Sequence, residues 1–171
     1  MNKRFKITLL IIIGALLLSL VIWRLWPRSM EGIFSLDPNS ASSITCTLMI
    51  DGLGSDGEPY TDFYNISNAT ADNEELHGII NLLCKSSYQQ DFRNLLPWKI
   101  TSAEADDSHD GRYVNISLQY ADQYYRIFFF SKDMMVVSLG DDSGYRFYHP
   151  VNEDVFDNVV EYIQLNGEKS P

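Results

Sequence analysis

The chain has few of the residues on which metal sites and catalytic sites usually depend. It contains two cysteines and three histidines in 171 residues. The cysteines form no Cys-x-x-Cys pair and the histidines are isolated, so we expect neither a zinc site nor a dithiol redox centre. No Gly-x-Ser-x-Gly turn is present to carry a hydrolase nucleophile. We therefore predict a protein that is not an enzyme, and keep as the alternative a cell-surface hydrolase or a metal-dependent enzyme that uses acidic turn residues.

Acidic residues are missing from the first 28 positions and abundant afterwards. All 23 Asp and Glu follow Arg28, together with eight of the 13 Lys and Arg, so this part of the chain carries a formal charge of −15. Such a charge repels the phosphates of nucleic acid and the surface of an anionic bilayer, and we expect no nucleic-acid partner. It favours solubility, and it is compatible with cationic partners or metal ions.

A long uncharged segment lies close to the N-terminus. Residues 7–23 contain no charged side chain, and their only polar side chains are Thr8 and Ser19. With its flanks, the segment 5–26 forms a helix close in length to the ~30 Å hydrocarbon core of a bilayer. Trp23 and Trp26 stand where aromatic anchors meet the membrane interface, and Pro27 ends the helix. We predict a transmembrane helix over residues 5–26, with the membrane as a partner.

The charges on either side of this segment predict its orientation. Three basic side chains and the free amine precede it, and two arginines follow it. The more basic flank stays in the cytoplasm, which predicts a cytoplasmic tail at residues 1–4 and a C-terminal domain outside a single-pass cell membrane protein. A cleaved signal peptide is the alternative, but bulky residues stand where a cleavage site needs small ones.

The pattern beyond the anchor predicts an α+β domain. Residues 27–43 are predicted to form a polar stalk with one turn near Met30–Leu36, residues 44–165 the domain, and residues 166–171 a flexible tail. Alternating or β-prone segments predict strands at 44–51, 60–66, 98–103, 112–120, 124–131, 134–139 and 145–148. Apolar residues at helical spacing predict helices at 72–86 and 150–163, and residues 88–97 a loop with one turn at 92–96. The order ββαβββββα predicts an antiparallel sheet with two helices packed on one face.

Glycines cluster in the segment Gly52–Gly57, which matches the pattern Gly-x-Gly-x-x-Gly. A dinucleotide site with this pattern needs a helix after the glycines, so that the pyrophosphate meets its N-terminus. Here a second strand follows, and the segment predicts a hairpin turn in which glycine supplies positive φ angles.

A second acidic turn resembles the first half of a calcium loop. Asp106, Ser108 and Asp110 would supply oxygen ligands, and Gly111 the sharp turn. The twelfth position of such a loop is Ser117 rather than Glu, so the bidentate ligand is missing. A solvated polar turn is the simpler interpretation, and calcium is the only cofactor that the sequence leaves open.

The two cysteines are Cys46, on the apolar side of a predicted strand, and Cys84, beside the apolar stripe of a predicted helix. Both could be small core residues. In an oxidising compartment they could instead form a disulfide, worth roughly 3–4 kcal/mol on the loop-entropy model.

Aromatic residues give the clearest hint of a binding surface. In the segment 124–131, neither of the two alternating sets of side chains is polar. Because two helices cover only one face of a sheet, Tyr124, Phe128 and Phe130 are predicted to form an aromatic docking surface on the other face. The alternative is that loops fold over this face.

A strand pair, a helix ending in Leu82-Leu83 and a tyrosine-rich hairpin from Tyr113 to Tyr125 follow one another between Ile44 and Ile163. This order resembles a loose group of small membrane-anchored or lipoprotein-like extracytoplasmic α+β domains of Gram-positive bacteria. The resemblance implies no known catalysis and carries over no functional residues, and the chain departs from it in lacking a lipid-modified cysteine. We expect a membrane-tethered extracytoplasmic binding or regulatory module whose partner is an extracytoplasmic protein or ligand.

Overall fold

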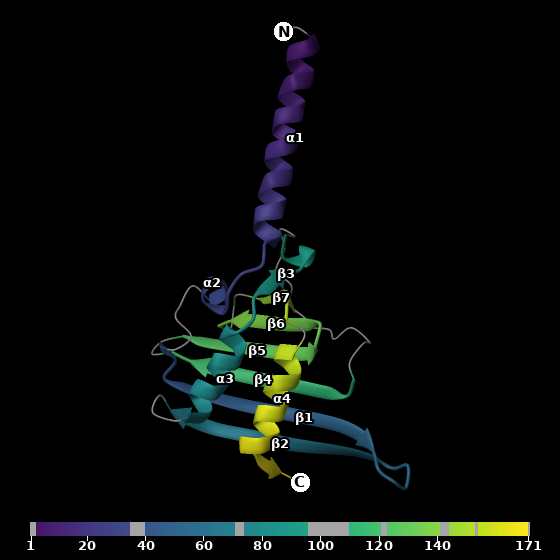
Figure 1. The fold of residues 1–171 in the computed structure, drawn as a ribbon, viewed down its shortest axis with the longest axis vertical. Coiled ribbons are helices and arrows are strands. Elements are labelled where there is room, and N and C mark those ends of the chain that lie inside the picture. Colours follow the sequence, from purple (N-terminus) through teal and green to yellow (C-terminus); the bar gives the residue numbers. More distant parts are fainter. Residues whose placement is uncertain are drawn as a thin grey trace.

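A computed structural model describes residues 3–34, 40–70, 74–95, 110–120, 123–140, 144–152 and 154–170. The first element, α1 (Lys3–Leu25), is a single straight helix that projects from the rest of the chain (Figure 1). Its segment Arg4–Leu25 is long and apolar enough to cross a membrane, and it is not buried against the rest of the protein. A candidate membrane span is therefore present where the sequence predicts one.

The remainder is an eight-stranded antiparallel sheet with the strand order β3-β7-β6-β5-β4-β1-β2-β8. The strands are β1 (Ser43–Leu53), β2 (Pro59–Thr70), β3 (Tyr88–Gln90), β4 (Arg112–Gln119), β5 (Tyr124–Ser131), β6 (Met134–Leu139), β7 (Tyr145–Pro150) and β8 (Glu168–Ser170). The strands run across the long axis of α1, so β3 is the edge nearest to α1 and β8 the edge farthest from it (Figure 1). The predicted α+β class and antiparallel sheet are confirmed.

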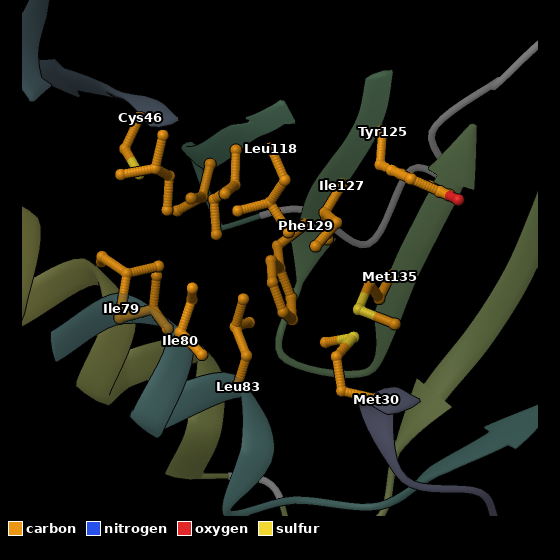
Figure 2. Packing of buried hydrophobic residues seen from close by; sticks show 14 of the residues in the cluster. Met30, Cys46, Ile79, Ile80, Leu83, Leu118, Tyr125, Ile127, Phe129 and Met135 are labelled. Atoms are coloured by element: carbon orange, nitrogen blue, oxygen red, sulfur yellow. The ribbon is translucent and has the colours of Figure 1, made fainter. Parts of the chain in front are cut away.

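Helices α3 (Glu74–Cys84) and α4 (Asp154–Asn166) lie side by side on one face of the sheet (Figure 1). Each presents an apolar stripe at helical spacing, which for α3 consists of Leu76, Ile79, Ile80 and Leu83. These side chains meet the inward residues of the strands in one continuous core (Figure 2). The packing of two helices on one face agrees with the prediction.

The alternation of β5 separates the two faces. Tyr125, Ile127 and Phe129 are buried and point toward the helices (Figure 2). Tyr124 and Phe128, which alternate with them, lie on the opposite face, called here the outer face.

The described residues 27–34 and 40–43 do not form the predicted polar stalk. The one predicted turn is present as α2 (Met30–Phe34), but its side chains Met30, Ile33 and Phe34 are at most 6% exposed and belong to the core. Met30 packs close to Met135 of the sheet (Figure 2). The polar composition of this segment predicts a stalk, but its three apolar residues are enough to fix it to the core of the folded domain.

Two further short elements differ from the prediction. Tyr88–Gln90 is strand β3 rather than a loop, and it pairs with β7. Glu168–Ser170 is strand β8 rather than a flexible tail; it pairs with β2, and Lys169 Nζ lies 2.7 Å from Asp62 Oδ2. Strands of three residues are too short to show an alternation. The predicted turn at 92–96 is present as the 3-10 helix η2 (Phe92–Leu95), and the strand predicted at 98–103 lies outside the described residues.

Candidate functional site

The outer face carries an apolar cluster of its own. Met134, Val136 and Phe147 are buried there, although α3 and α4 lie on the other side of the sheet. Phe128, Phe130 and Tyr145 pack against these residues and remain partly exposed. A sheet face that water alone contacts would show polar residues at these positions. The outer face is therefore more apolar than a sheet face that contacts only water.

A groove of about 200 Å³ opens on this face. Its outer-face lining comes from four neighbouring strands: Thr47 and Met49 of β1, Phe63 of β2, Tyr113 and Asn115 of β4, and Phe128 and Phe130 of β5. We call it the outer groove. Almost all of its exposed surface is apolar, so an occupant would be bound mainly by burial of apolar area.

The aromatic side chains of the outer groove hold one another in place. The rings of Phe128 and Phe130 stack with centroids 6.2 Å apart, and Tyr113 meets Phe130 edge to face at 6.4 Å. Phe128 also meets Tyr145 edge to face at 6.5 Å. Such pairs favour fixed ring positions. The groove is thus preformed, which lowers the entropy lost when a partner binds.

Two polar side chains in the outer groove, Asn115 and Tyr113, could form hydrogen bonds that orient a bound partner. The Oδ1 atom of Asn115 is buried and accepts no hydrogen bond, so a donor from a bound partner would satisfy it. Burial, with added repulsion from Asp51 and Asp110, raises the pKa of Tyr113, which keeps its hydroxyl protonated.

A smaller polar pocket of about 80 Å³ lies beside the outer groove. Tyr124, Arg126, Ser138, Gly140 and Tyr145 line it, and the Arg126 guanidinium lies 5.1 Å from the centre of the Tyr124 ring. The structure therefore places all three predicted surface residues on the outer face. Phe128 and Phe130 both line the outer groove, whereas Tyr124 lines the polar pocket beside it.

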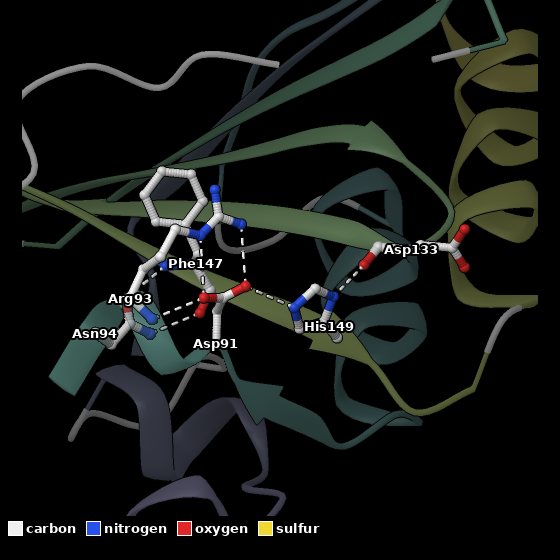
Figure 3. Close-up of polar contacts among 6 residues, drawn as sticks. All are labelled: Asp91, Arg93, Asn94, Asp133, Phe147 and His149. Atoms are coloured by element: carbon white, nitrogen blue, oxygen red, sulfur yellow. Dashed lines mark hydrogen bonds and ion pairs between the residues drawn. The ribbon is translucent and has the colours of Figure 1, made fainter. Parts of the chain in front are cut away.

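A second polar cluster lies where β3, η2 and β7 meet (Figure 3). The Nε2 atom of His149 lies 2.9 Å from Oδ2 of Asp91, and its Nδ1 lies 2.7 Å from the carbonyl oxygen of Asp133. Arg93 donates to both oxygens of Asp91, each at 3.0 Å. Burial opposes ionisation of Asp91, but hydrogen bonds from Arg93 and His149 lower its pKa to about 2. Because both nitrogens of His149 are occupied, this cluster suits the joining of segments better than acid–base catalysis.

The calcium prediction falls largely outside the described residues, which do not include Asp106 and Ser108. Asp110 is described, and both of its oxygens accept hydrogen bonds from Arg112. Hydrogen bonding to this side chain, opposed by burial and assisted by its charge, lowers the pKa of Asp110. Arg112 also reaches Asp157 of α4 at 2.7 Å. Within the described ranges, no three His, Cys, Asp or Glu side chains converge to hold a metal ion.

Cys46 and Cys84 are not joined, so the structure does not contain the disulfide considered from the sequence. Cys46 is fully buried in the core, and Cys84 is exposed at the end of α3. Burial strongly raises the pKa of the Cys46 thiol, which keeps it protonated and unreactive.

The sequence did not indicate the Asp91–His149 contact or the contributions of Met49 and Phe63 to the outer groove. The contact joins residues 58 positions apart, and no local pattern predicts such a pair. For Met49 and Phe63, the alternation of their strands could have predicted a position on the outer face, opposite the core-facing residues, but not their place in a groove.

No protein-family model, curated protein or solved structure matches the chain. Its function is therefore inferred from the geometry of its own residues.

Proposed function

We propose that the chain is a membrane-tethered binding module: α1 spans the cell membrane with its N-terminus inside, and the outer groove binds an apolar segment of an extracytoplasmic protein. The observation that carries this proposal is the preformed apolar groove on the sheet face opposite α3 and α4. Aromatic side chains that line such a groove offer the large contact area on which protein–protein interfaces depend.

The size of the outer groove favours a protein side chain over a free small molecule. Pockets for drug-sized ligands are commonly about 300–1,000 Å³ and enclose most of the ligand. The outer groove holds about 200 Å³ and opens to solvent. That volume accommodates one or two apolar side chains, which act as anchors in protein–protein interfaces. The unsatisfied Asn115 Oδ1 would accept a hydrogen bond from the backbone or side chain of the same segment.

The location is tested with the exposed thiol of Cys84. A membrane-impermeant maleimide applied to intact expressing cells should label Cys84, because the domain would lie outside. The Cys84→Ser variant is the control for specificity. If the reagent labels Cys84 only after the cells are lysed, the proposed orientation is wrong.

The binding surface is tested by site-specific photocrosslinking in the same cells. A benzophenone amino acid at Phe130 should capture a discrete partner, and one at His77, an exposed position on α3, should not. Capture through position 130 should be lost when Phe128 is changed to Asp. Equal capture from both positions, or capture that survives Phe128→Asp, would remove the outer groove as the binding site.

A further inference from the structure

The end of α1 is joined directly to the sheet. Three residues after α1 ends, Arg28 donates its backbone N–H to the carbonyl of Tyr88 at 2.9 Å, and Tyr88 returns a bond to Arg28 at 2.8 Å. The buried helix α2 follows at once. A chain fixed by two backbone hydrogen bonds and then by the core has no length left for a flexible linker. The β3 edge of the sheet therefore stays beside the end of α1 (Figure 1).

The short helix η2 lies at the same end of the domain as α1 and is held rigidly (Figure 1). Asn94 donates to the carbonyl of Phe147 at 2.6 Å and accepts from its N–H at 2.9 Å. The Asp91 N–H donates to the same carbonyl at 3.0 Å, and the Arg93 guanidinium stacks 4.1 Å from the centre of the Phe147 ring (Figure 3). Four contacts to one residue of β7 fix the position of this short helix.

Within this rigid helix, the apolar side chains point away from the protein. Phe92 is 68% exposed and Leu95 is 38% exposed. Trp26, at the end of α1, and Val151, hydrogen-bonded to Ser87 just before β3, are also exposed. Among described residues beyond α1, eight large apolar side chains are exposed, and four of them are at this one end. Water alone does not explain why apolar side chains would be held in place where they cannot collapse inward.

We propose that η2 is a bilayer contact: Phe92 and Leu95 enter the interface of the membrane that α1 spans, so that the sheet stands on the membrane by its β3 edge. This inference rests on the proposed membrane span. The surface is continuous with α1 through the Arg28–Tyr88 pair. Trp23 and Trp26 mark the level of the interface, where aromatic side chains collect. The Arg28 guanidinium, 5.4 Å from the centre of the Trp23 ring, lies at the level of the lipid phosphates.

This arrangement places the outer groove clear of the lipid. Its strands, β5 to β2, are three to six strand positions from β3, which corresponds to about 14–29 Å at the usual spacing between strands. The acidic charge of the domain disfavours an anionic bilayer surface, so the contact depends on insertion of apolar side chains, which in a zwitterionic bilayer needs no charge attraction.

The test uses the full chain, reconstituted in phosphatidylcholine vesicles. One sample contains a phospholipid spin-labelled near the carbonyl end of its acyl chain, at the depth expected for Phe92, and a second contains one labelled near the terminal methyl, at the depth expected for Leu16. Single cysteines at Leu16, Leu53 and Phe92 are introduced in the Cys84→Ser background and labelled with an environment-sensitive fluorophore, while Cys46 stays buried and unlabelled. Leu53 is the matched control, because it is apolar, 73% exposed and located on β1, far from β3. We expect blue-shifted, lipid-quenched emission at positions 16 and 92, and water-accessible emission at position 53.

The outcomes separate the two proposals. If position 16 is quenched and position 92 stays accessible to water, the bilayer contact of η2 is wrong while the membrane span stands. If position 16 is not quenched, the membrane span fails, and the contact fails with it. If position 53 is quenched as strongly as position 92, the domain lies flat on the lipid, and the edge-on arrangement is wrong.

Discussion

His149 and Asp91 form the contact that closes the β3 edge of the sheet, with Nε2 of the imidazole 2.9 Å from Oδ2 of the carboxylate. Since Nδ1 faces the carbonyl oxygen of Asp133, a protonated ring donates to both acceptors, whereas a neutral ring donates to only one. Asp91 is 7% exposed and also holds Arg93. The pair therefore connects β7, the turn between β5 and β6, and the start of η2.

This contact predicts a stability loss in acid. A carboxyl whose pKa is lower in the folded than in the unfolded chain stabilises the fold above its unfolded pKa, and that contribution disappears as the pH falls to the folded value. For Asp91 the window runs from its ordinary pKa of 3.8 down to about 2. Asp91→Asn should therefore cost about 1–2 kcal/mol of unfolding free energy at pH 7 and progressively less as the pH falls through this window.

The measurement is urea unfolding of the full chain in mild detergent, for both proteins at several pH values. Asp133→Asn is the matched control, since it removes a nearby carboxylate and keeps the backbone oxygen that His149 contacts. If the difference in unfolding free energy between wild type and Asp91→Asn stays constant down to pH 2, the stabilisation does not come from ionised Asp91.

The two thiols predict a two-step labelling pattern. A maleimide should modify Cys84 in the folded protein within minutes, because its side chain is exposed, whereas Cys46 should react only after unfolding. Mass spectrometry under non-reducing conditions should count one adduct in buffer and two in denaturant. No adduct in denaturant would mean that the cysteines are bridged, which would restore the disulfide considered from the sequence.

Two glycines with the same backbone angle test how closely β1 and the start of β4 approach. Gly57 and Gly111 both have φ of +82°. A Cβ at Gly57 would meet nothing within 4 Å, but one at Gly111 would lie 2.7 Å from the backbone oxygen of Asp51. Gly57→Ala should therefore cost about 1 kcal/mol through strain alone. Gly111→Ala should cost about 1–3 kcal/mol more, because a backbone oxygen cannot turn aside.

Thermal unfolding of the two variants in detergent gives the comparison. Equal losses would show that the strand start moves freely away from Asp51. A larger loss at Gly57 would contradict the geometry of both turns.

The sequence was sufficient for elements whose signal lies within the element itself. The stripes of α3 and α4 and the alternation of β1, β4 and β5 predicted the helices, most of the sheet and the outer-face positions of Phe128 and Phe130. The positive φ angle at Gly57 was likewise expected from the hairpin turn.

The features that the sequence did not predict depend on contacts between residues far apart in the chain. Tyr88 of β3 pairs with Arg28, 60 residues before it, and with Pro150 of β7, 62 residues after it. Strand β8 pairs with β2, more than 100 residues away. The turn that forms α2 was predicted, but its burial was not, because its three apolar residues are interrupted by Glu31 and Gly32 and are buried only against the rest of the core. Local periodicity carries no information about such pairings.

The two faces of β5 can be compared by mutating adjacent phenylalanines, because Phe128 and Phe129 lie on opposite faces of the strand. Phe129 is fully buried and its ring lies 6.0 Å from that of Phe156 in α4, whereas Phe128 is partly exposed on the outer face. Phe129→Ala should remove about 3–5 kcal/mol of unfolding free energy, as large-to-small changes in a packed core do. Phe128→Ala should remove roughly half as much or less, because part of its surface already contacts water.

The effect on partner crosslinking should follow the opposite order, with a larger loss for Phe128→Ala than for Phe129→Ala. With Phe128→Ala, photocrosslinking from position 130 should fall severalfold while the protein stays folded, because the stacked ring beside Phe130 is lost. The Phe129→Ala variant should be compared under conditions in which urea unfolding shows that it is still folded. Its crosslinking from position 130 should then stay near the wild-type level, since the side chain of Phe129 points toward the helices. Equal stability losses for the two variants would mean that the outer face is packed as tightly as the helix face. That result would leave no open apolar groove for a partner to enter.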